Sequence, residues 1–209
     1  MEAKFCTHQS FCLTKIPGII SITLIRTSLG PDPQSVYSDA PVSRDTCYVA
    51  SEGFPNLIYS GYQPHAYSWD EFPPLKEILD LVHKALPGSK FNSLLLNRYK
   101  GGNDHVGWHA DDEKLYGLTP EIASVSFGCE RDFFLKKKPS KTVHAKENGG
   151  DPPGKRTKKN NDSDQRSFVL KHGSLLVMRG YTQRDWVHSV PKRVKAAAVR
   201  INLTFRLIC

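Results

Sequence analysis

The sequence predicts a mainly β fold with flanking helices, in which antiparallel strands close into a barrel or a jelly roll. Three observations support this expectation. The clearest helical repeat of apolar side chains lies in a single stretch, residues 73–86. The residues after it fall into short segments rich in β-branched, aromatic and leucine side chains. Many short strands of this kind hide their edges by closing on themselves or by forming a double-layered jelly roll.

Residues 1–43 are interpreted as an atypical, partly irregular N-terminal segment, ahead of one domain at 44–209. The stretch CLTKIPGIISITLI has the β-branched residues of a strand, whereas SLGPDPQSVYSDAPVSRD is rich in Pro, Ser and Asp and is typical of a loop. With 209 residues, the chain is long enough for one domain with a hydrophobic core.

The predicted helix at 73–86 is amphipathic. A proline suits its first turn, and Pro87 with Gly88 ends it. The segments DTCYVA and NLIYSGY precede it as short strand candidates. Five apolar side chains share one face of this helix: Leu75, Ile78, Leu79, Val82 and Leu86.

Five longer strand candidates follow the helix: FNSLLLNRY, EIASVSFG, RDFFLKKK, SFVLKHGSLLVMRG and AVRINLTFRLI. A stretch of Lys, Asn, Asp, Gly and Pro interrupts them between Pro139 and Ser167. Because this stretch has little apolar surface to bury, it is predicted to be a basic, disordered insert in a loop that joins two strands.

The net charge of +8 comes largely from that part of the chain. Eleven Lys and Arg and four Asp and Glu lie between Lys136 and Lys171. Such a segment, with GKRTKK at 154–159 as its most basic part, is typical of a phosphate contact or a nuclear-import signal. A solvated loop without a partner is the alternative interpretation.

Several classes of protein are disfavoured by composition. No apolar run approaches the roughly 18 residues of a membrane span. The beginning MEAKFCTHQSFC lacks the basic-then-apolar pattern of a signal peptide, so secretion is not expected. The cysteines are odd in number and scattered, and without a CxxC pair they predict a reduced, intracellular protein and no zinc knuckle: Cys6, Cys12, Cys47, Cys129 and Cys209.

The segment WHADDE, residues 108–113, carries the first candidate metal ligands. In an extended chain alternate side chains share a face, so His109 and Asp111 point the same way. One imidazole and one carboxylate are two thirds of a 2-His-1-carboxylate set, which leaves three positions open on Fe(II). A 2-oxo acid and dioxygen can fill those positions. Taken alone, an HxD pair is more often a polar surface feature.

A third ligand has to come from elsewhere in the chain, and three histidines are candidates. His144 lies in the predicted insert, and His172 precedes a glycine in a predicted turn. His188 lies in the short apolar segment DWVHSVP and is the preferred candidate. The alternative is a half-buried histidine that is satisfied by hydrogen bonds.

The C-terminal segment RINLTFR, residues 200–206, alternates polar and apolar side chains. If it is a strand that lines a barrel, its two arginines are buried, and buried arginines need anions such as the carboxylates of 2-oxoglutarate. A solvent-exposed face of an edge strand is the alternative. In LLLNRYK, two further polar side chains share a face and are able to add hydrogen bonds to the same ligand. The polar residues of these two segments are Asn97, Tyr99, Arg200, Asn202, Thr204 and Arg206.

These segments, in this order, resemble the AlkB family of Fe(II)/2-oxoglutarate dioxygenases, and most of all its homologues 2 and 3. The resemblance rests on NRYKGG, HADDE, IASVSFG, RDF, HGSLLVM, WVHSVP and RINLTFR, and runs from about Arg44 to the C-terminus. It implies a double-stranded β-helix, or jelly roll. It also implies Fe(II) on His109, Asp111 and His188. The implied co-substrate residues for 2-oxoglutarate are Asn97, Tyr99, Arg200 and Arg206, with Asn202 and Thr204 nearby.

The resemblance further implies oxidative demethylation of 1-methyladenine and 3-methylcytosine in DNA, with release of formaldehyde, succinate and carbon dioxide. Tyr59 is expected to stack on a flipped base, and Ser60 to contact nearby backbone. Asp112 and Glu113 are expected to face the base, where a carboxylate favours the cationic, methylated form. The alternatives are a core aromatic for Tyr59 and a solvated turn for the two carboxylates.

Residues 1–42 do not resemble the segment that usually forms part of the nucleic-acid lid in this subgroup. The resemblance therefore supports activity on single-stranded DNA more directly than activity on duplexes. The same chemistry on RNA is one alternative, and a module that binds methylated nucleic acid without turnover is another. The expected protein is a monomer in the nucleus, with the cytoplasm as a further location.

Overall fold

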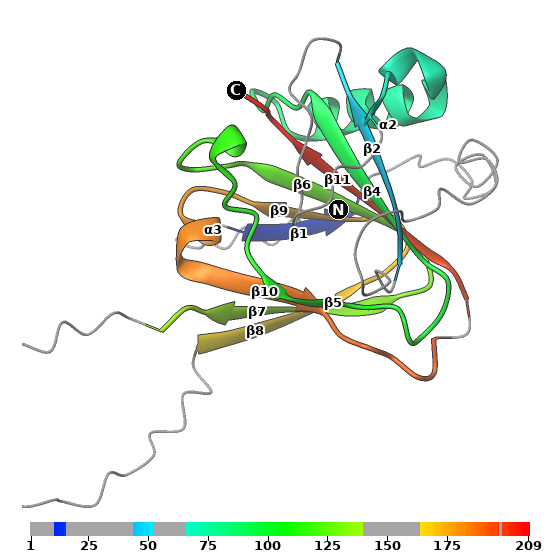
Figure 1. Ribbon diagram of the computed structural model, residues 1–209, viewed down its shortest axis with the longest axis vertical. Helices are drawn as coiled ribbons and strands as arrows, with labels where there is room; N and C mark the ends of the chain where they lie inside the picture. The colour runs from blue at the N-terminus through cyan, green and yellow to red at the C-terminus, as the bar shows by residue number, and fades with distance from the viewer. Residues whose placement is uncertain (1–10, 16–43, 52–65, 140–163, 197) are drawn as a thin grey trace, which may run out of the picture.

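The chain folds into two facing β-sheets, with one long helix packed on the outer side of the larger sheet, as the ribbon in Figure 1 shows. The computed structural model describes residues 11–15, 44–51, 66–139, 164–196 and 198–209. The sheets have seven and four strands, in the orders β1-β9-β6-β11-β4-β2-β3 and β5-β10-β7-β8. All strand pairs in the described part are antiparallel except β2 with β3. This arrangement confirms the predicted antiparallel jelly roll.

The elements have the following bounds. The large sheet contains β1 (Phe11–Lys15), β2 (Asp45–Ala50), β3 (Ala66–Tyr67), β4 (Ser93–Tyr99), β6 (Ile122–Gly128), β9 (Ser174–Met178) and β11 (Arg200–Arg206). The small sheet contains β5 (Val106–His109), β7 (Arg131–Lys137), β8 (Gln165–Leu170) and β10 (Trp186–Val190). The helices are α2 (Pro73–Ala85) and α3 (Thr182–Asp185), with 3-10 turns η1 (Trp69–Glu71) and η2 (Lys114–Tyr116).

Helix α2 covers the outer face of the large sheet, which confirms the amphipathic prediction (Figure 1). Leu75, Ile78 and Val82 are buried on its inner face. They belong to a core cluster that includes Leu203 and Phe205 of β11. This cluster anchors the outer side of the sheet and leaves the inner side available for a site.

Strand β11 is the central strand of the seven-stranded sheet: it lies between β6 and β4 and is buried along its whole length. The alternative of a solvent-exposed edge strand is therefore wrong. Because side chains alternate along a strand, the apolar residues face α2 while Asn202 and Thr204 face the small sheet. The fold thus turns a polar row of side chains into the interior.

A second apolar cluster fills part of the space between the two sheets. It joins Tyr99 of β4 and Met178 of β9 to Phe133, Leu135 and Val190 of the small sheet. These side chains hold the two layers together on their inner faces. The remaining interior space is the polar cavity described below.

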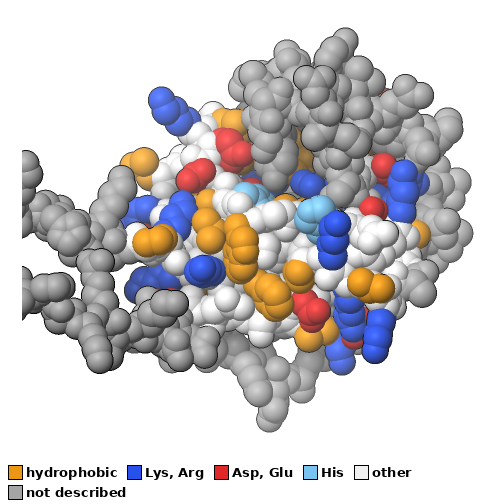
Figure 2. Space-filling model, turned by 60° about the horizontal axis from the view of Figure 1, so that its bottom comes forward, with side chains coloured by type: hydrophobic (Ala, Val, Ile, Leu, Met, Phe, Trp, Pro, Cys, Tyr) orange, Lys and Arg blue, Asp and Glu red, His pale blue; other side chains and the backbone are white. Residues whose placement is uncertain are grey.

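The outer face of the small sheet carries a band of hydrophobic side chains with Lys and Arg side chains around it (Figure 2). Trp108 is 48% exposed there and stacks on Phe134, with ring centroids 6.4 Å apart. Because neighbouring side chains on a strand point to opposite faces, an outward Trp108 directs His109 inward. Local strand geometry therefore aims the first candidate ligand at the cavity.

Some sequence predictions lie outside the described residues, including NLIYSGY, most of the N-terminal stretch and positions 140–163. Strand β8 begins at Gln165, so the last three positions of the predicted insert belong to this strand. In the part of the chain that the structure describes, no helix has the length and apolar character needed to cross a lipid bilayer.

Candidate active site

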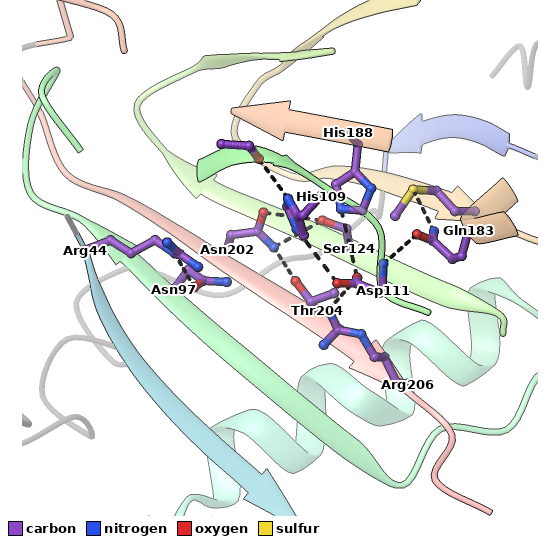
Figure 3. A network of polar contacts seen from close by, with 12 residues as sticks. Arg44, Asn97, His109, Asp111, Ser124, Gln183, His188, Asn202, Thr204 and Arg206 are labelled. Atoms are coloured by element: carbon purple, nitrogen blue, oxygen red, sulfur yellow. Dashed lines mark hydrogen bonds and ion pairs between the residues drawn. The ribbon is translucent and has the colours of Figure 1, made fainter. Parts of the chain in front are cut away.

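Two histidines and one aspartate meet at the inner face of the small sheet (Figure 3). His109 ends β5 and is the cross-strand partner of His188 on β10, with the ring centroids 4.2 Å apart. Asp111 follows two residues after the end of β5. One potential ligand atom from each residue lies within 4.8 Å of those of the other two.

Both imidazoles are held in a form that suits a metal ligand. His109 Nδ1 lies 2.9 Å from the carbonyl oxygen of Gly107, to which it donates, so Nε2 is the ring nitrogen left for a metal ion. His109 Nε2 lies 3.8 Å from Asp111 Oδ1. Burial lowers the pKa of His188 to about 3, although the nearby carboxylate of Asp111 acts to raise this pKa. His188 is therefore neutral at physiological pH, as a ligand must be.

Asp111 is buried and ionised. Burial alone would raise its pKa, but Arg206 and the two histidines outweigh this effect and hold the pKa well below its usual range. Arg206 Nη2 donates to Asp111 Oδ2 at 2.6 Å. Asp111 Oδ1, by contrast, is buried without a hydrogen-bond partner among the described groups. A carboxylate with one oxygen paired and one open suits a single bond to a metal ion.

The donor set of two imidazoles and one carboxylate on one side of a cavity fits Fe(II) with open positions. The other candidate histidines do not join it. His172 Nδ1 accepts a hydrogen bond from the backbone amide of Gly128, the last residue of β6 in the large sheet, at 3.2 Å. His144 lies outside the described residues.

A polar cavity continues from this cluster between the sheets. Asn202 Nδ2 donates to Ser124 Oγ at 3.1 Å and to Thr204 Oγ1 at 3.0 Å, which fixes the floor of the cavity (Figure 3). Arg44 Nε donates to Asn97 Oδ1 at 2.7 Å. The cavity lining contains five of the six residues expected at the co-substrate: Asn97, Tyr99, Asn202, Thr204 and Arg206.

The sixth, Arg200, is fully buried beside the cavity and contacts its lining. Its Nη2 donates to Ser126 Oγ at 3.0 Å and to Asn202 Oδ1 at 2.7 Å. Its Nε and Nη1 have no acceptor in the described part of the chain. The guanidinium lies 4.9 Å from the centroid of the Tyr99 ring, and Arg131 lies 5.3 Å from the same centroid. Two buried cations therefore lie close to the ring of one tyrosine.

Of the four residues expected to contact a base, the two that the structure describes do not line the cavity. Asp112 has a side chain that is 62% exposed, with Lys138 Nζ 3.3 Å from its Oδ2. Burial raises the pKa of Glu113, which lies within the electrostatic reach of Asp111 and Arg206. Neither residue lines the cavity. Tyr59 and Ser60 lie outside the described residues.

Three residues of the site are not apparent from motifs. Arg44 lines the cavity, Arg131 lies over the ring of Tyr99, and Gln183 Oε1 accepts from the backbone amide of Asp111 at 3.0 Å. Each is distant in sequence from its partner, so no local spacing points to the contact. A local signal exists only for two other residues near the site. The polar alternation of SVSFG predicts that Ser124 and Ser126 face inward.

Comparison with known proteins agrees with this site. The family model of the 2OG-Fe(II) oxygenase superfamily matches residues 30–206. A protein of Arabidopsis thaliana named "DNA oxidative demethylase ALKBH2" is 69% identical over 166 residues, which are 79% of this chain and 53% of that protein. The human "Alpha-ketoglutarate-dependent dioxygenase alkB homolog 3" is 45% identical over 121 residues, or 58% of this chain and 38% of that protein.

The chain thus spans about half the length of the curated relatives it matches. A solved structure titled "The structure of OsALKBH1" shares the fold, with a TM-score of 0.58 at 18% identity over 96% of this chain and 99% of that one. The matched region contains the histidine–aspartate cluster and the arginine-bearing strand β11. The chain therefore belongs to the 2OG-Fe(II) oxygenase superfamily and, within it, to the AlkB family, with the sequence character of homologues 2 and 3.

Proposed function

We propose that this chain is an Fe(II)- and 2-oxoglutarate-dependent dioxygenase that demethylates N-alkylated bases in DNA, with 1-methyladenine and 3-methylcytosine as substrates. One observation carries the proposal. A 2-His-1-carboxylate cluster lines a cavity between the sheets, and beside that cavity lies a fully buried arginine, Arg200, that lacks a carboxylate partner among the described residues. The family that the sequence matches and the names of its relatives support the same function.

The reaction couples two oxidations to the reduction of dioxygen. The bound iron would activate dioxygen, so that one oxygen atom enters succinate as 2-oxoglutarate loses carbon dioxide and the other enters the N-methyl group. Each oxidation supplies two of the four electrons. The resulting N-hydroxymethyl base then breaks its N–C bond, releasing formaldehyde, and the O–H proton leaves as the electron pair returns to the ring nitrogen.

The protein side chains have separate roles in this proposal. His109, Asp111 and His188 would hold the metal, and Arg206 keeps Asp111 ionised by its bond to Oδ2. Arg200 would bind the distal carboxylate of 2-oxoglutarate with its two open nitrogens. The remaining polar lining, Asn97, Tyr99, Asn202 and Thr204, would orient the same molecule.

Substrate contacts are assigned to Tyr59, Ser60, Asp112 and Glu113. Asp112 is exposed at the end of the loop that carries Asp111, which suits a contact with a cationic base outside the cavity. Because Lys138 lies 3.3 Å from this carboxylate, the base would have to compete with the lysine. An exposed pair of this kind contributes only about 0–1 kcal/mol, so the exchange is feasible.

Nucleic-acid binding is proposed to involve the basic insert. Deletion of residues 140–163 keeps Lys138 and all of β8 and removes Lys155, Arg156, Lys158 and Lys159. We expect this variant to retain turnover but to bind single-stranded DNA more weakly at low salt, because it releases fewer counterions. Equal affinities of the two proteins across a salt titration would exclude a phosphate role. The same basic segment supports a nuclear location, which imaging of a tagged chain with and without it tests.

Direct measurement of demethylation tests the proposed function. The protein is incubated with Fe(II), 2-oxoglutarate, ascorbate and a single-stranded DNA oligonucleotide containing 1-methyladenine, and formaldehyde and restored adenine are quantified. We expect both products in equal amounts. His188→Ala should abolish turnover because one metal ligand is lost, while His172→Ala, a histidine outside the cluster, should retain it.

The same assay separates the alternatives. Matched DNA and RNA oligonucleotides distinguish DNA repair from RNA demethylation, because only a requirement for the ribose 2′-hydroxyl would favour RNA. Binding of the methylated oligonucleotide without formaldehyde release would identify a binding module without turnover and reject the enzyme. Size-exclusion chromatography with light scattering tests the proposed monomer.

A further inference from the structure

The loop that carries Asp111 is anchored from outside its own strand. Strand β5 ends at His109, so the backbone ladder of the small sheet does not extend to Asp111. Its backbone amide donates instead to Gln183 Oε1, 3.0 Å away and 72 positions along the chain (Figure 3). Gln183 belongs to α3, the short helix that leads into β10 and His188.

The side-chain amide of Gln183 is fixed in one orientation. A backbone N–H can only donate, so it requires the oxygen of the glutamine amide and not its nitrogen. Gln183 Nε2 donates to Met178 Sδ at 3.4 Å, and Met178 itself lines the cavity. Gln183 is 1% exposed, so water does not compete for either end. Both ends of the amide are therefore occupied by partners that select a single rotamer.

A second contact holds α3 against the same loop. Lys138, just beyond the end of β7, donates from Nζ to the carbonyl oxygen of Gln183 at 2.9 Å, and its backbone amide donates to the carbonyl oxygen of Asp185 at 2.7 Å. The same Nζ reaches Asp112 Oδ2 at 3.3 Å. The backbone of Gln183 is thus braced, and its side chain is held at a fixed distance from Asp111.

We propose that Gln183 is a positioning residue that sets the carboxylate of Asp111 for metal binding; the inference rests on the proposed function in that the ion is the Fe(II) of the dioxygenase. His109 and His188 take their mutual position from the β5–β10 pairing. Asp111 lacks that constraint and takes its position from two long-range contacts: Arg206 on the carboxylate and Gln183 on the backbone. Without Gln183 the carboxylate would also sample positions from which it cannot bind the same ion as the two imidazoles.

Binding of Co(II), a probe for the iron site with visible absorption, tests this role without nucleic acid or turnover. Gln183→Met keeps the length of the side chain but removes the acceptor. We expect it to bind Co(II) roughly 10–100-fold more weakly, the usual effect of losing an outer-shell partner, and to change the ligand-field spectrum. Gln183→Glu keeps an acceptor oxygen and should bind more tightly than Gln183→Met.

Thr182→Val is the matched control. Thr182 is the neighbouring residue of α3, is equally buried at 1%, and donates from Oγ1 to the carbonyl oxygen of Arg179 at 2.7 Å. This variant should lower the melting temperature as Gln183→Met does, yet leave Co(II) affinity and spectrum as in the wild type. The comparison separates a role at the metal from general support of the turn.

Two results would overturn the inference: unchanged Co(II) affinity and spectrum in Gln183→Met, or an equal loss of affinity in Thr182→Val. Failure of the wild-type protein to demethylate DNA while the Co(II) results hold would overturn the proposed substrate and leave the role of Gln183 standing. An active wild type with a Gln183→Met variant that binds Co(II) normally would overturn the inference alone.

Discussion

The two ends of the cavity differ in how their charges are compensated. At the end formed by Asp111, the carboxylate has Arg206 at 2.6 Å and a neutral His188 beside it. At the end formed by Tyr99, the cations Arg131 and Arg200 lie 5.3 and 4.9 Å from the centroid of the tyrosine ring, and both are buried. No carboxylate in the described ranges forms an ion pair with either of these arginines.

This difference shows which parts of the site are complete before a ligand arrives. The pair of Asp111 and Arg206 is satisfied within the protein, apart from the open oxygen that faces the two histidines. The buried positive charge at the other end is satisfied only in part, by hydroxyl, amide and carbonyl oxygens. Burying a charge without an opposite charge is unfavourable, so this end is preorganised for an anion.

Removing a charge should therefore have opposite effects on stability at the two ends. The largest effect is expected for Asp111→Ala. It leaves the buried Arg206 without this carboxylate and should lower the free energy of unfolding by about 3–5 kcal/mol. Metal binding should be lost as well. Urea denaturation and Co(II) titration measure the two effects. Asp112→Ala, the exposed neighbour, should change neither by a comparable amount.

Arg200→Met tests the other end. Because this arginine has no carboxylate partner in the described structure, the variant should unfold at the same urea concentration as the wild type or at a higher one. Its affinity for 2-oxoglutarate should fall by at least about 30-fold, the effect of deleting one partner of a buried charge pair. Calorimetry with Mn(II) in place of iron measures the affinity. If Arg200→Met is destabilised but binds 2-oxoglutarate normally, the Tyr99 end of the cavity is not the end that awaits an anion.

A change of ligand sharpens the same comparison without mutation. 2-Oxobutyrate has the 2-oxo acid group of 2-oxoglutarate but lacks the distal carboxylate. At 100 times its dissociation constant, 2-oxoglutarate should stabilise the Mn(II)-loaded protein by about 2.7 kcal/mol. 2-Oxobutyrate at the same concentration should stabilise it far less. In Arg200→Met the difference between the two ligands in a thermal-shift assay should disappear; if it persists, the distal carboxylate binds elsewhere.

The smallest effect is expected for Arg131→Met. Arg131 donates to the carbonyl oxygens of Asp104 and Pro191 and acts on the cavity through Tyr99. Loss of this second cation should weaken 2-oxoglutarate binding by roughly threefold and leave Co(II) affinity unchanged. Arg184, which stacks on Tyr181 at the surface, provides a control: Arg184→Met should leave both affinities as they are.

Much of this arrangement follows from local sequence patterns. The alternation in RINLTFR predicts which side chains of β11 point inward, and LLLNRYK does the same for Asn97 and Tyr99. The strand candidate DTCYVA coincides with β2, because its β-branched and aromatic residues lie between breaks in the pattern. Properties with a period of two residues can be read from neighbouring positions alone.

The contacts that complete the site cannot be read in this way. Gln183 reaches Asp111 across 72 positions, and Arg131 reaches Pro191 across 60. Such contacts depend on how the two sheets face each other, a tertiary property with no local signal. The preference for His188 over His172 came from its apolar surroundings, and the cross-strand pairing with His109 supplies the physical reason.

An anaerobic absorption titration tests most directly whether one molecule joins the two ends of the cavity. A 2-oxo acid that chelates Fe(II) produces a visible metal-to-ligand charge-transfer band, so the band reports simultaneous occupation of the iron and co-substrate sites. We predict that it appears when 2-oxoglutarate is added to the Fe(II)-loaded protein, saturates at one equivalent, and is absent from His188→Ala. Bound iron that develops no such band with 2-oxoglutarate, or an unchanged band in His188→Ala, would contradict the account.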